Sequence, residues 1–94
     1  MFNVLVNHKV RDYKEWKKVF DGFIDNRRSG GEKSFRIFHP ANDANNLTLL
    51  FEWDNRANAE KFMSSPNLKT AMERGGVLEE PTIQFLDQVA QGNL

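Results

Sequence analysis

Two histidines and a set of large aromatic side chains are the residues of this 94-residue chain best suited to chemistry. An imidazole with its ordinary pKa of about 6.5 can take or give a proton near neutral pH. The chain has no cysteine, which excludes thiolate nucleophiles, disulfides and Cys-ligated metals. His8 is therefore the candidate relay for a proton from a phenolic or enolic substrate. The alternative is a strand-end histidine that is hydrogen-bonded to the backbone.

A metal site shared by the two histidines is not expected. His8 and His39 each end a predicted strand, and we expect these two strands to run antiparallel, which places the two rings at opposite edges of the sheet. Ligands of one ion lie about 2.1 Å from it, so the pair could not share an ion within one subunit. No predicted helix contains a histidine that could hold a haem. The sequence predicts no metal and no cofactor.

Large apolar side chains recur where predicted helices meet the predicted sheet. They would suit a flat aromatic ligand if they enclosed a cavity. The alternative is that they simply fill a core, as close packing requires. The candidate substrate-binding residues are Trp16, Phe20, Phe51, Trp53, Phe62 and Met72.

The elements that must position these side chains follow from the spacing of apolar residues. Asn46–Asp54 alternates apolar and mixed residues with a period of two, which predicts a central strand. Further strands are predicted at 2–9, 34–39 and 82–87. An amphipathic helix of about five turns should run from Asp12, the first residue of a capping-box pattern, to Gly30-Gly31. Two shorter helices should follow the central strand, the second starting at Ser65-Pro66.

The element order predicts an α+β fold, a ferredoxin-like βαββαβ sandwich with a four-stranded antiparallel sheet. The predicted helices should all cover the same face of the sheet. We expect the first and third strands to lie side by side at its centre as a parallel pair. That pairing would place His8 next to Trp53.

The other face of the sheet should carry several apolar residues with no helix over them. These are Leu5, Phe38, Leu50 and Leu86. Four large apolar side chains on an uncovered face indicate a protein contact. A short chain also gains stability from a second copy. We predict a homodimer formed by packing two sheets face to face.

Charge and composition argue against nucleic-acid binding and membrane contact. The formal net charge is zero, so nothing favours nucleic acid. A solvated helix face explains the basic stripe Lys14, Lys17, Lys18, Arg27 and Arg28. The chain lacks a signal-peptide pattern and an apolar run of about 18 residues, which predicts a cytoplasmic protein with no membrane contact. We expect one domain over residues 1–88 and a tail over 89–94.

The assembled pattern resembles the dimeric α/β-barrel superfamily, close to small antibiotic-biosynthesis-monooxygenase-type domains. The clearest local resemblance is Phe51-Glu52-Trp53-Asp54, followed by Ala59, Ser65-Pro66 and Leu68. The superfamily includes cofactor-free quinol oxygenases, haem-degrading enzymes and lactone isomerases. This chain departs from the pattern at two positions, because Phe62 and Asn67 stand where many relatives carry histidine.

The resemblance implies a small-molecule-binding dimer, with a cofactor-independent monooxygenase acting on an aromatic or polyketide-like substrate as the first hypothesis. A non-catalytic ligand-binding or protein-interaction domain is the alternative. A cavity of about 300 Å³ or more with His8 on its wall would favour the first. A packed interior with His8 turned to bulk water would favour the second.

Overall fold

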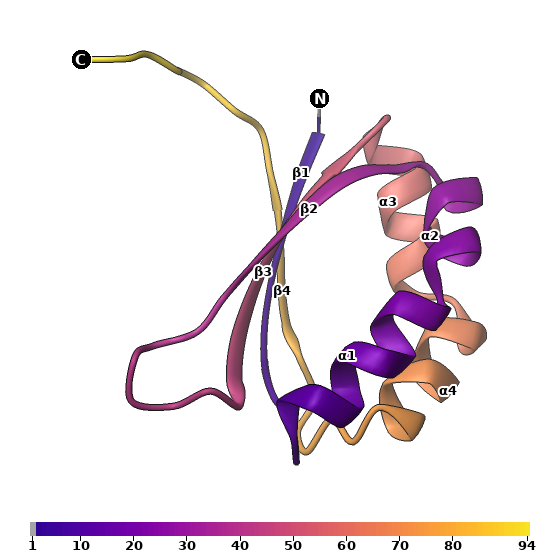
Figure 1. Cartoon of the computed structure of the whole chain (residues 1–94). Helices are drawn as coiled ribbons and strands as arrows, with labels where there is room; N and C mark the ends of the chain where they lie inside the picture. Colours follow the sequence, from indigo (N-terminus) through magenta and orange to yellow (C-terminus); the bar gives the residue numbers. More distant parts are fainter. Residues whose placement is uncertain (1) are drawn as a thin grey trace.

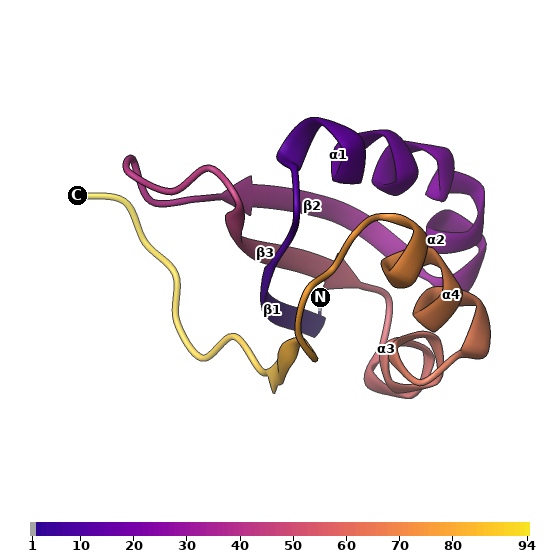
Figure 2. The ribbon, with the colours of Figure 1, turned by 90° about the horizontal axis from the view of Figure 1, so that it is seen from below.

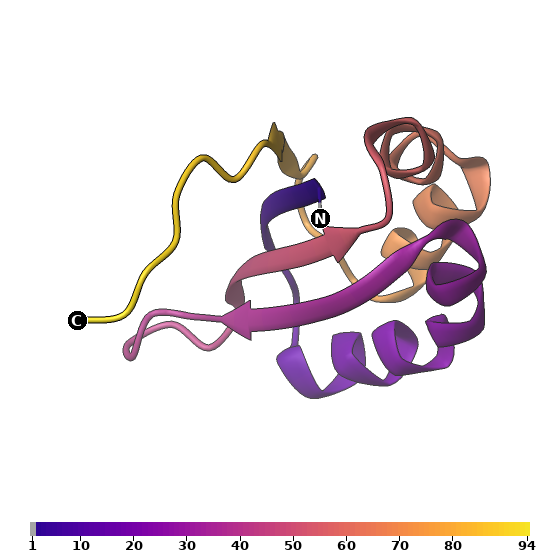
Figure 3. The same ribbon diagram turned by 90° about the horizontal axis from the view of Figure 1, so that it is seen from above.

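The computed structural model describes residues 2–94, which form one sheet with all of its helices on one side (Figure 1). Figures 2 and 3, which view the chain from below and above, show the same two layers. The elements in chain order are β1 (Phe2–Lys9), α1 (Tyr13–Gly22), α2 (Ile24–Gly30), β2 (Glu32–Phe38), β3 (Asn46–Trp53), α3 (Arg56–Met63), α4 (Pro66–Arg74) and β4 (Thr82–Leu86). The predicted ferredoxin-like α+β sandwich is confirmed.

The sheet order is β2-β3-β1-β4, and every neighbouring pair is antiparallel. The prediction that β1 and β3 form a parallel pair is wrong. The crossover through α1 and α2 returns the chain so that β2 runs parallel to β1. The following hairpin then reverses the chain, and β3 lies between the two strands, antiparallel to both.

The first predicted helix is divided in two. α1 ends at Gly22, and Phe23, with φ −93° and ψ 10°, separates it from α2. Glycine in a helix interior costs about 1 kcal/mol relative to alanine, which weakens the helix at this point. α2 is capped by Gly31, whose φ of 119° is a left-handed conformation that glycine adopts without steric cost.

The caps predicted for α1 and α4 are present. Asp12 accepts a hydrogen bond from the Glu15 backbone N–H at 3.0 Å at the start of α1. Ser65 accepts one from the Leu68 N–H at 3.2 Å, and Pro66 takes the first position of α4. These local signals fix where the helices begin, and hence which residues they present to the sheet.

The core lies between the sheet and the helices. The alternation in β1 and β3 buries Val4, Leu47 and Trp53 completely, and their outward-pointing neighbours stay half-buried or exposed. β4 ends at Leu86, and residues 87–94 form neither helix nor strand and extend away from the sheet (Figure 1). None of the helices within residues 2–94 has the length and apolar character needed to cross a membrane.

Candidate functional site

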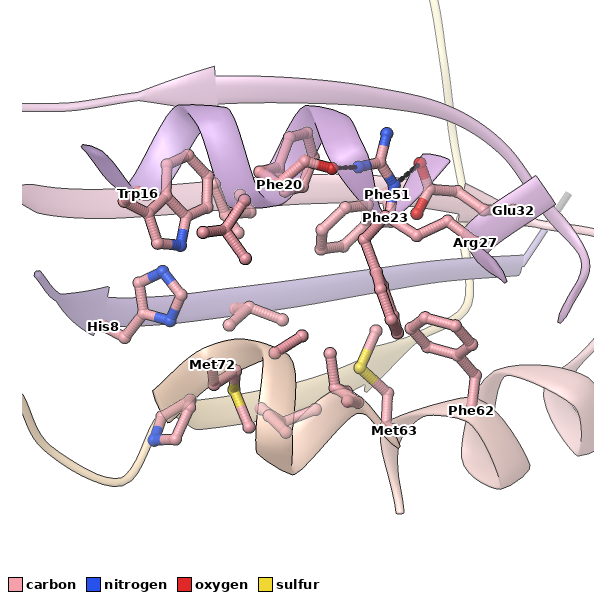
Figure 4. Close-up of a pocket in the computed structure, with 17 residues that line it drawn as sticks. His8, Trp16, Phe20, Phe23, Arg27, Glu32, Phe51, Phe62, Met63 and Met72 are labelled. Atoms are coloured by element: carbon pink, nitrogen blue, oxygen red, sulfur yellow. Dashed lines mark hydrogen bonds and ion pairs between the residues drawn. The ribbon is translucent and has the colours of Figure 1, made fainter. Parts of the chain in front are cut away.

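A cavity of about 70 Å³ lies between the sheet and the helices (Figure 4). Most of the side chains that line it are apolar, and they include five Phe and Trp rings and two methionines. Five of the six predicted substrate-binding residues line it: Trp16, Phe20, Phe51, Phe62 and Met72. The sixth, Trp53, is fully buried but does not line the cavity; its ring packs on Phe62 with centroids 5.0 Å apart.

His8 lies at one end of this cavity and points into it (Figure 4). β1 places it on the helix-covered face, where 5% of its surface is exposed. Neither ring nitrogen has a hydrogen-bond partner among the described residues. The rings of His8 and Trp16 are arranged edge to face, with centroids 5.7 Å apart and planes at 80°. The alternative considered from the sequence, a histidine that is hydrogen-bonded to the backbone, is therefore wrong.

Burial lowers the pKa of His8 from 6.5 to about 4, because the imidazolium loses its hydration there. The ring is thus neutral at pH 7, with one nitrogen as a donor and the other as an acceptor. Both are free to bind a molecule in the cavity.

Two expectations about the histidines fail because the strands run the other way. His8 pairs with Leu47 at the start of β3, whereas Trp53 pairs with Phe2, so His8 and Trp53 lie at opposite ends of the strands. His8 and His39 lie at the same end of the sheet, since Phe38 pairs with Thr48, next to Leu47. His39 is exposed, and its Nδ1 lies 2.7 Å from the Pro40 carbonyl oxygen.

A buried ion pair at the other end of the cavity was not predicted. Arg27 Nε donates to Glu32 Oε2 at 3.1 Å, and the two side chains are 5% and 6% exposed. Arg27 Nη1 also donates to the Phe20 carbonyl oxygen, and the guanidinium carbon lies 3.7 Å from the centre of the Phe20 ring. The assignment of Arg27 to a solvated basic stripe is wrong, because α2 turns this side chain into the core.

Glu32 keeps one oxygen without a partner. No donor among residues 2–94 reaches its buried Oε1. Burial raises the pKa of the Glu32 carboxyl, and the charge and hydrogen bond of Arg27 oppose that rise. The pair therefore gives the cavity a second polar end, with a free acceptor.

One signal in the sequence indicated that Arg27 faces inward, and none indicated this for Glu32. Arg27 continues the three- and four-residue spacing of Trp16, Phe20 and Phe23, which is typical of an inward-facing position. Glu32 faces inward because the register of β2 shifts between Glu32 and Ser34, so that Glu32 pairs with inward-facing Trp53. A shift of this kind cannot be read from residue types.

A surface groove of about 820 Å³ adjoins the cavity along α4 and β4. The groove and the cavity share four lining residues: Met63, Met72, Pro81 and Ile83. Methionine side chains are unbranched and change rotamer easily. The wall between the cavity and the groove thus contains two side chains of an adaptable type.

Within the described part of the chain, no group of three or more His, Cys, Asp or Glu side chains is placed to hold a metal ion. The ionisable side chains that line the cavity are those of His8, Arg27 and Glu32. They can hydrogen-bond a small molecule, take a proton from it or return one.

No protein-family model and no curated protein matches the sequence. The fold is nevertheless similar to that of several solved structures. A candidate antibiotic biosynthesis monooxygenase from Bordetella bronchiseptica aligns over 95% of this chain and 97% of its own length, with a TM-score of 0.78 and 12% identity. A further antibiotic biosynthesis monooxygenase covers 96% of this chain and 100% of its own, with a TM-score of 0.72 and 13% identity.

A third similar structure is SnoaB, a cofactor-independent oxygenase from Streptomyces nogalater. It covers 94% of each chain with a TM-score of 0.71 and 11% identity. Likeness at this level of identity establishes a shared fold along almost the whole chain. The resemblance to antibiotic-biosynthesis-monooxygenase-type domains is therefore confirmed as a resemblance of fold.

Proposed function

We propose that this protein binds a small aromatic molecule between its sheet and helices and oxidises it with dioxygen, without a cofactor. The observation that carries the proposal is a buried, unpartnered, neutral His8 on the wall of an aromatic-lined cavity. Similarity in fold to SnoaB, described as a cofactor-independent oxygenase, supports the reaction class. A quinol-like or polyketide-like ring system would suit the flat aromatic walls.

The proposed reaction needs a substrate that supplies its own electrons. An activated ring CH₂ loses a proton to give a carbanion, which bonds to one atom of dioxygen. The resulting peroxide anion takes up a proton to become a hydroperoxide, which loses water and leaves a ring carbonyl. One oxygen atom ends in the product and the other in water, and the CH₂ carbon supplies all four electrons.

His8 would move the proton in both directions. A free imidazole whose pKa is about 4 is a weak base, so it takes up little proton while the cavity holds no acid. A substrate anion forming beside it would stabilise the imidazolium and raise that pKa. The dry, apolar walls strengthen this attraction. Proton transfer would thus depend on bound substrate.

The cavity volume of about 70 Å³ sets a condition on this proposal. It is well below the ~300 Å³ of an ordinary ligand site, and less than half of the ~150 Å³ that holds benzene in an engineered protein cavity. A multi-ring substrate would therefore need Met63 and Met72 to move and join the cavity to the adjoining groove. The same small volume favours the second candidate, a binding domain without turnover.

The test is oxygen consumption with a panel of polycyclic phenols that carry an activated ring CH₂, followed by mass spectrometry of the product after reaction under ¹⁸O₂. We expect one labelled oxygen atom in the product and loss of turnover in His8→Gln. Binding without oxygen uptake across the panel would favour the second candidate. Turnover that is unchanged in His8→Gln would remove His8 from the mechanism.

We also propose that a second copy of the chain covers the open face of the sheet. All four helices lie on the opposite face (Figure 2), and Phe38 and Leu86 on the open face are 50% and 37% exposed. Leu5 and Leu50, which pair across β1 and β3, lie between them in the sheet. Sedimentation at micromolar concentration should give twice the chain mass of 10.9 kDa, and Leu50→Lys should give the single-chain mass. A monomeric wild type would contradict the proposal.

A further inference from the structure

Burying the charged Arg27–Glu32 pair costs free energy, and one oxygen of the Glu32 carboxylate has no donor. Packing alone therefore does not account for the pair. Removing two charges from water costs several kcal/mol per ion, which close pairing only partly offsets. Arg27 uses Nε and Nη1 on Glu32 and on the Phe20 carbonyl, whereas Glu32 Oε1 has no donor. A buried acceptor without a partner is destabilising unless a bound molecule completes it.

The place of this acceptor in the cavity indicates a ligand contact. Arg27 and Glu32 both line the cavity, at the opposite end from His8 (Figure 4). On β3, Leu47 pairs with His8 and Trp53 pairs with Glu32, so these two positions correspond to the two ends of the cavity. Six residue steps of ~3.4 Å separate these positions, about 20 Å along the strand. The Glu32 end therefore contacts a different part of a ligand from the part that reaches His8.

The charges at this end select the kind of molecule. Arg27 and Glu32 cancel each other, and His8 is neutral at pH 7, so the cavity carries no net charge to match an ionic ligand. Phe23 and Phe51 line the cavity next to the pair, whereas the Phe20 ring stacks on Trp16 and lies under the Arg27 guanidinium (Figure 4). An aromatic ring fits such apolar walls, and a hydroxyl on that ring can donate to a carboxylate oxygen.

We infer that Glu32 is the specificity-determining contact of this cavity, accepting at Oε1 a hydrogen bond from the hydroxyl of a neutral aromatic ligand while Arg27 holds the carboxylate in place. This inference rests on the proposed binding function and gives its substrate class: an elongated, uncharged phenol with its hydroxyl at the end remote from His8. The hydroxyl is a recognition group and need not react.

Phenol and toluene are matched probes, since they differ by a hydroxyl in place of a methyl group. Binding is followed through ¹³C-methyl NMR signals of Met63 and Met72, which line the cavity. The quantity compared is the ratio of phenol to toluene affinity. The test variant is the double substitution Arg27→Met with Glu32→Leu, because exchanging both members of a buried ion pair for apolar residues is often neutral for folding.

The control makes the same two exchanges at an exposed pair. Arg56 Nε donates to Glu60 Oε1 at 2.7 Å on the surface of α3, away from the cavity lining. Arg56→Met with Glu60→Leu therefore changes charge and composition equally without touching the cavity. His8→Gln tests the other polar end in the same assay.

We expect the phenol-to-toluene ratio to fall about 10-fold or more in Arg27→Met/Glu32→Leu, the size of one hydrogen bond to a charged acceptor. The ratio should stay at the wild-type value in Arg56→Met/Glu60→Leu. A ratio that is unchanged in the cavity variant, or that falls only in His8→Gln, would overturn the inference and leave the proposed function standing. Failure of the wild type to bind either probe would overturn both, because it would show that Met63 and Met72 do not move to admit even a single ring.

Discussion

Each end of the cavity buries a polar side chain, and the two side chains differ in charge and in hydrogen bonding. At one end His8 stays neutral and has no partner, so burial costs it the ability to be charged. At the other end Glu32 is held beside a cation, and only one of its two oxygens is satisfied. The first arrangement suits a group that must exchange a proton. The second suits a group that must keep its position, because Arg27 holds one carboxylate oxygen. We therefore assign reaction to one end and recognition to the other.

Breaking the ion pair on one side should have the largest effect. Arg27→Met leaves the Glu32 carboxylate buried without compensation, and losing one member of such a pair costs ~3–5 kcal/mol of unfolding free energy. Urea denaturation measures it. The double variant Arg27→Met/Glu32→Leu should recover most of this loss. A double variant as unstable as the single one would mean that Arg27 acts through packing on Phe20 instead.

The second-largest effect is a loss of unfolding free energy on acidification, which is caused by protonation of His8. The folded-state pKa of about 4 lies below the ordinary 6.5, so the contribution is complete above pH 6.5 and lost as pH falls towards 4. At ~1.4 kcal/mol per pKa unit, the difference between 6.5 and about 4 amounts to at most about 3.5 kcal/mol. Thermal melts between pH 7 and 4 should show this slope in wild type and a reduced slope in His8→Gln.

The Glu32 end should respond to pH in the opposite sense. Its carboxyl pKa is raised in the folded state, so its contribution is complete below the ordinary pKa of 4.5 and declines as pH rises through the raised value. Glu32→Gln removes this term, and its unfolding free energy should fall more steeply than that of wild type between pH 6.5 and 4. An identical pH profile in Glu32→Gln would show that the carboxyl is not perturbed.

The smallest effect is expected from His8→Gln at pH 7. His8 makes no hydrogen bond to the described residues, so its replacement by another polar side chain should change the unfolding free energy by less than ~1 kcal/mol. Turnover, once a substrate is found, should be lost. A large destabilisation at pH 7 would instead indicate that His8 is a structural residue.

Sequence patterns were sufficient for the element order and the buried faces, though not for the direction of β3 relative to β1, because they report local rules. The period of two in β1 and β3 and the caps at Asp12 and Ser65 each depend on near neighbours in the chain. The same patterns identified the inward faces, and with them most of the cavity wall, including His8 and Phe51.

What the sequence alone determined, then, is the order of elements, the faces they bury and the candidate proton relay. The tertiary structure decided which residues meet. The direction of β3 separated His8 from Trp53, and a one-residue register shift in β2 turned Glu32 inward to Arg27. Both outcomes depend on pairing between strands distant in sequence. Residue types at single positions do not encode that pairing, because a strand presents the same alternating faces in either direction and a register shift exchanges them.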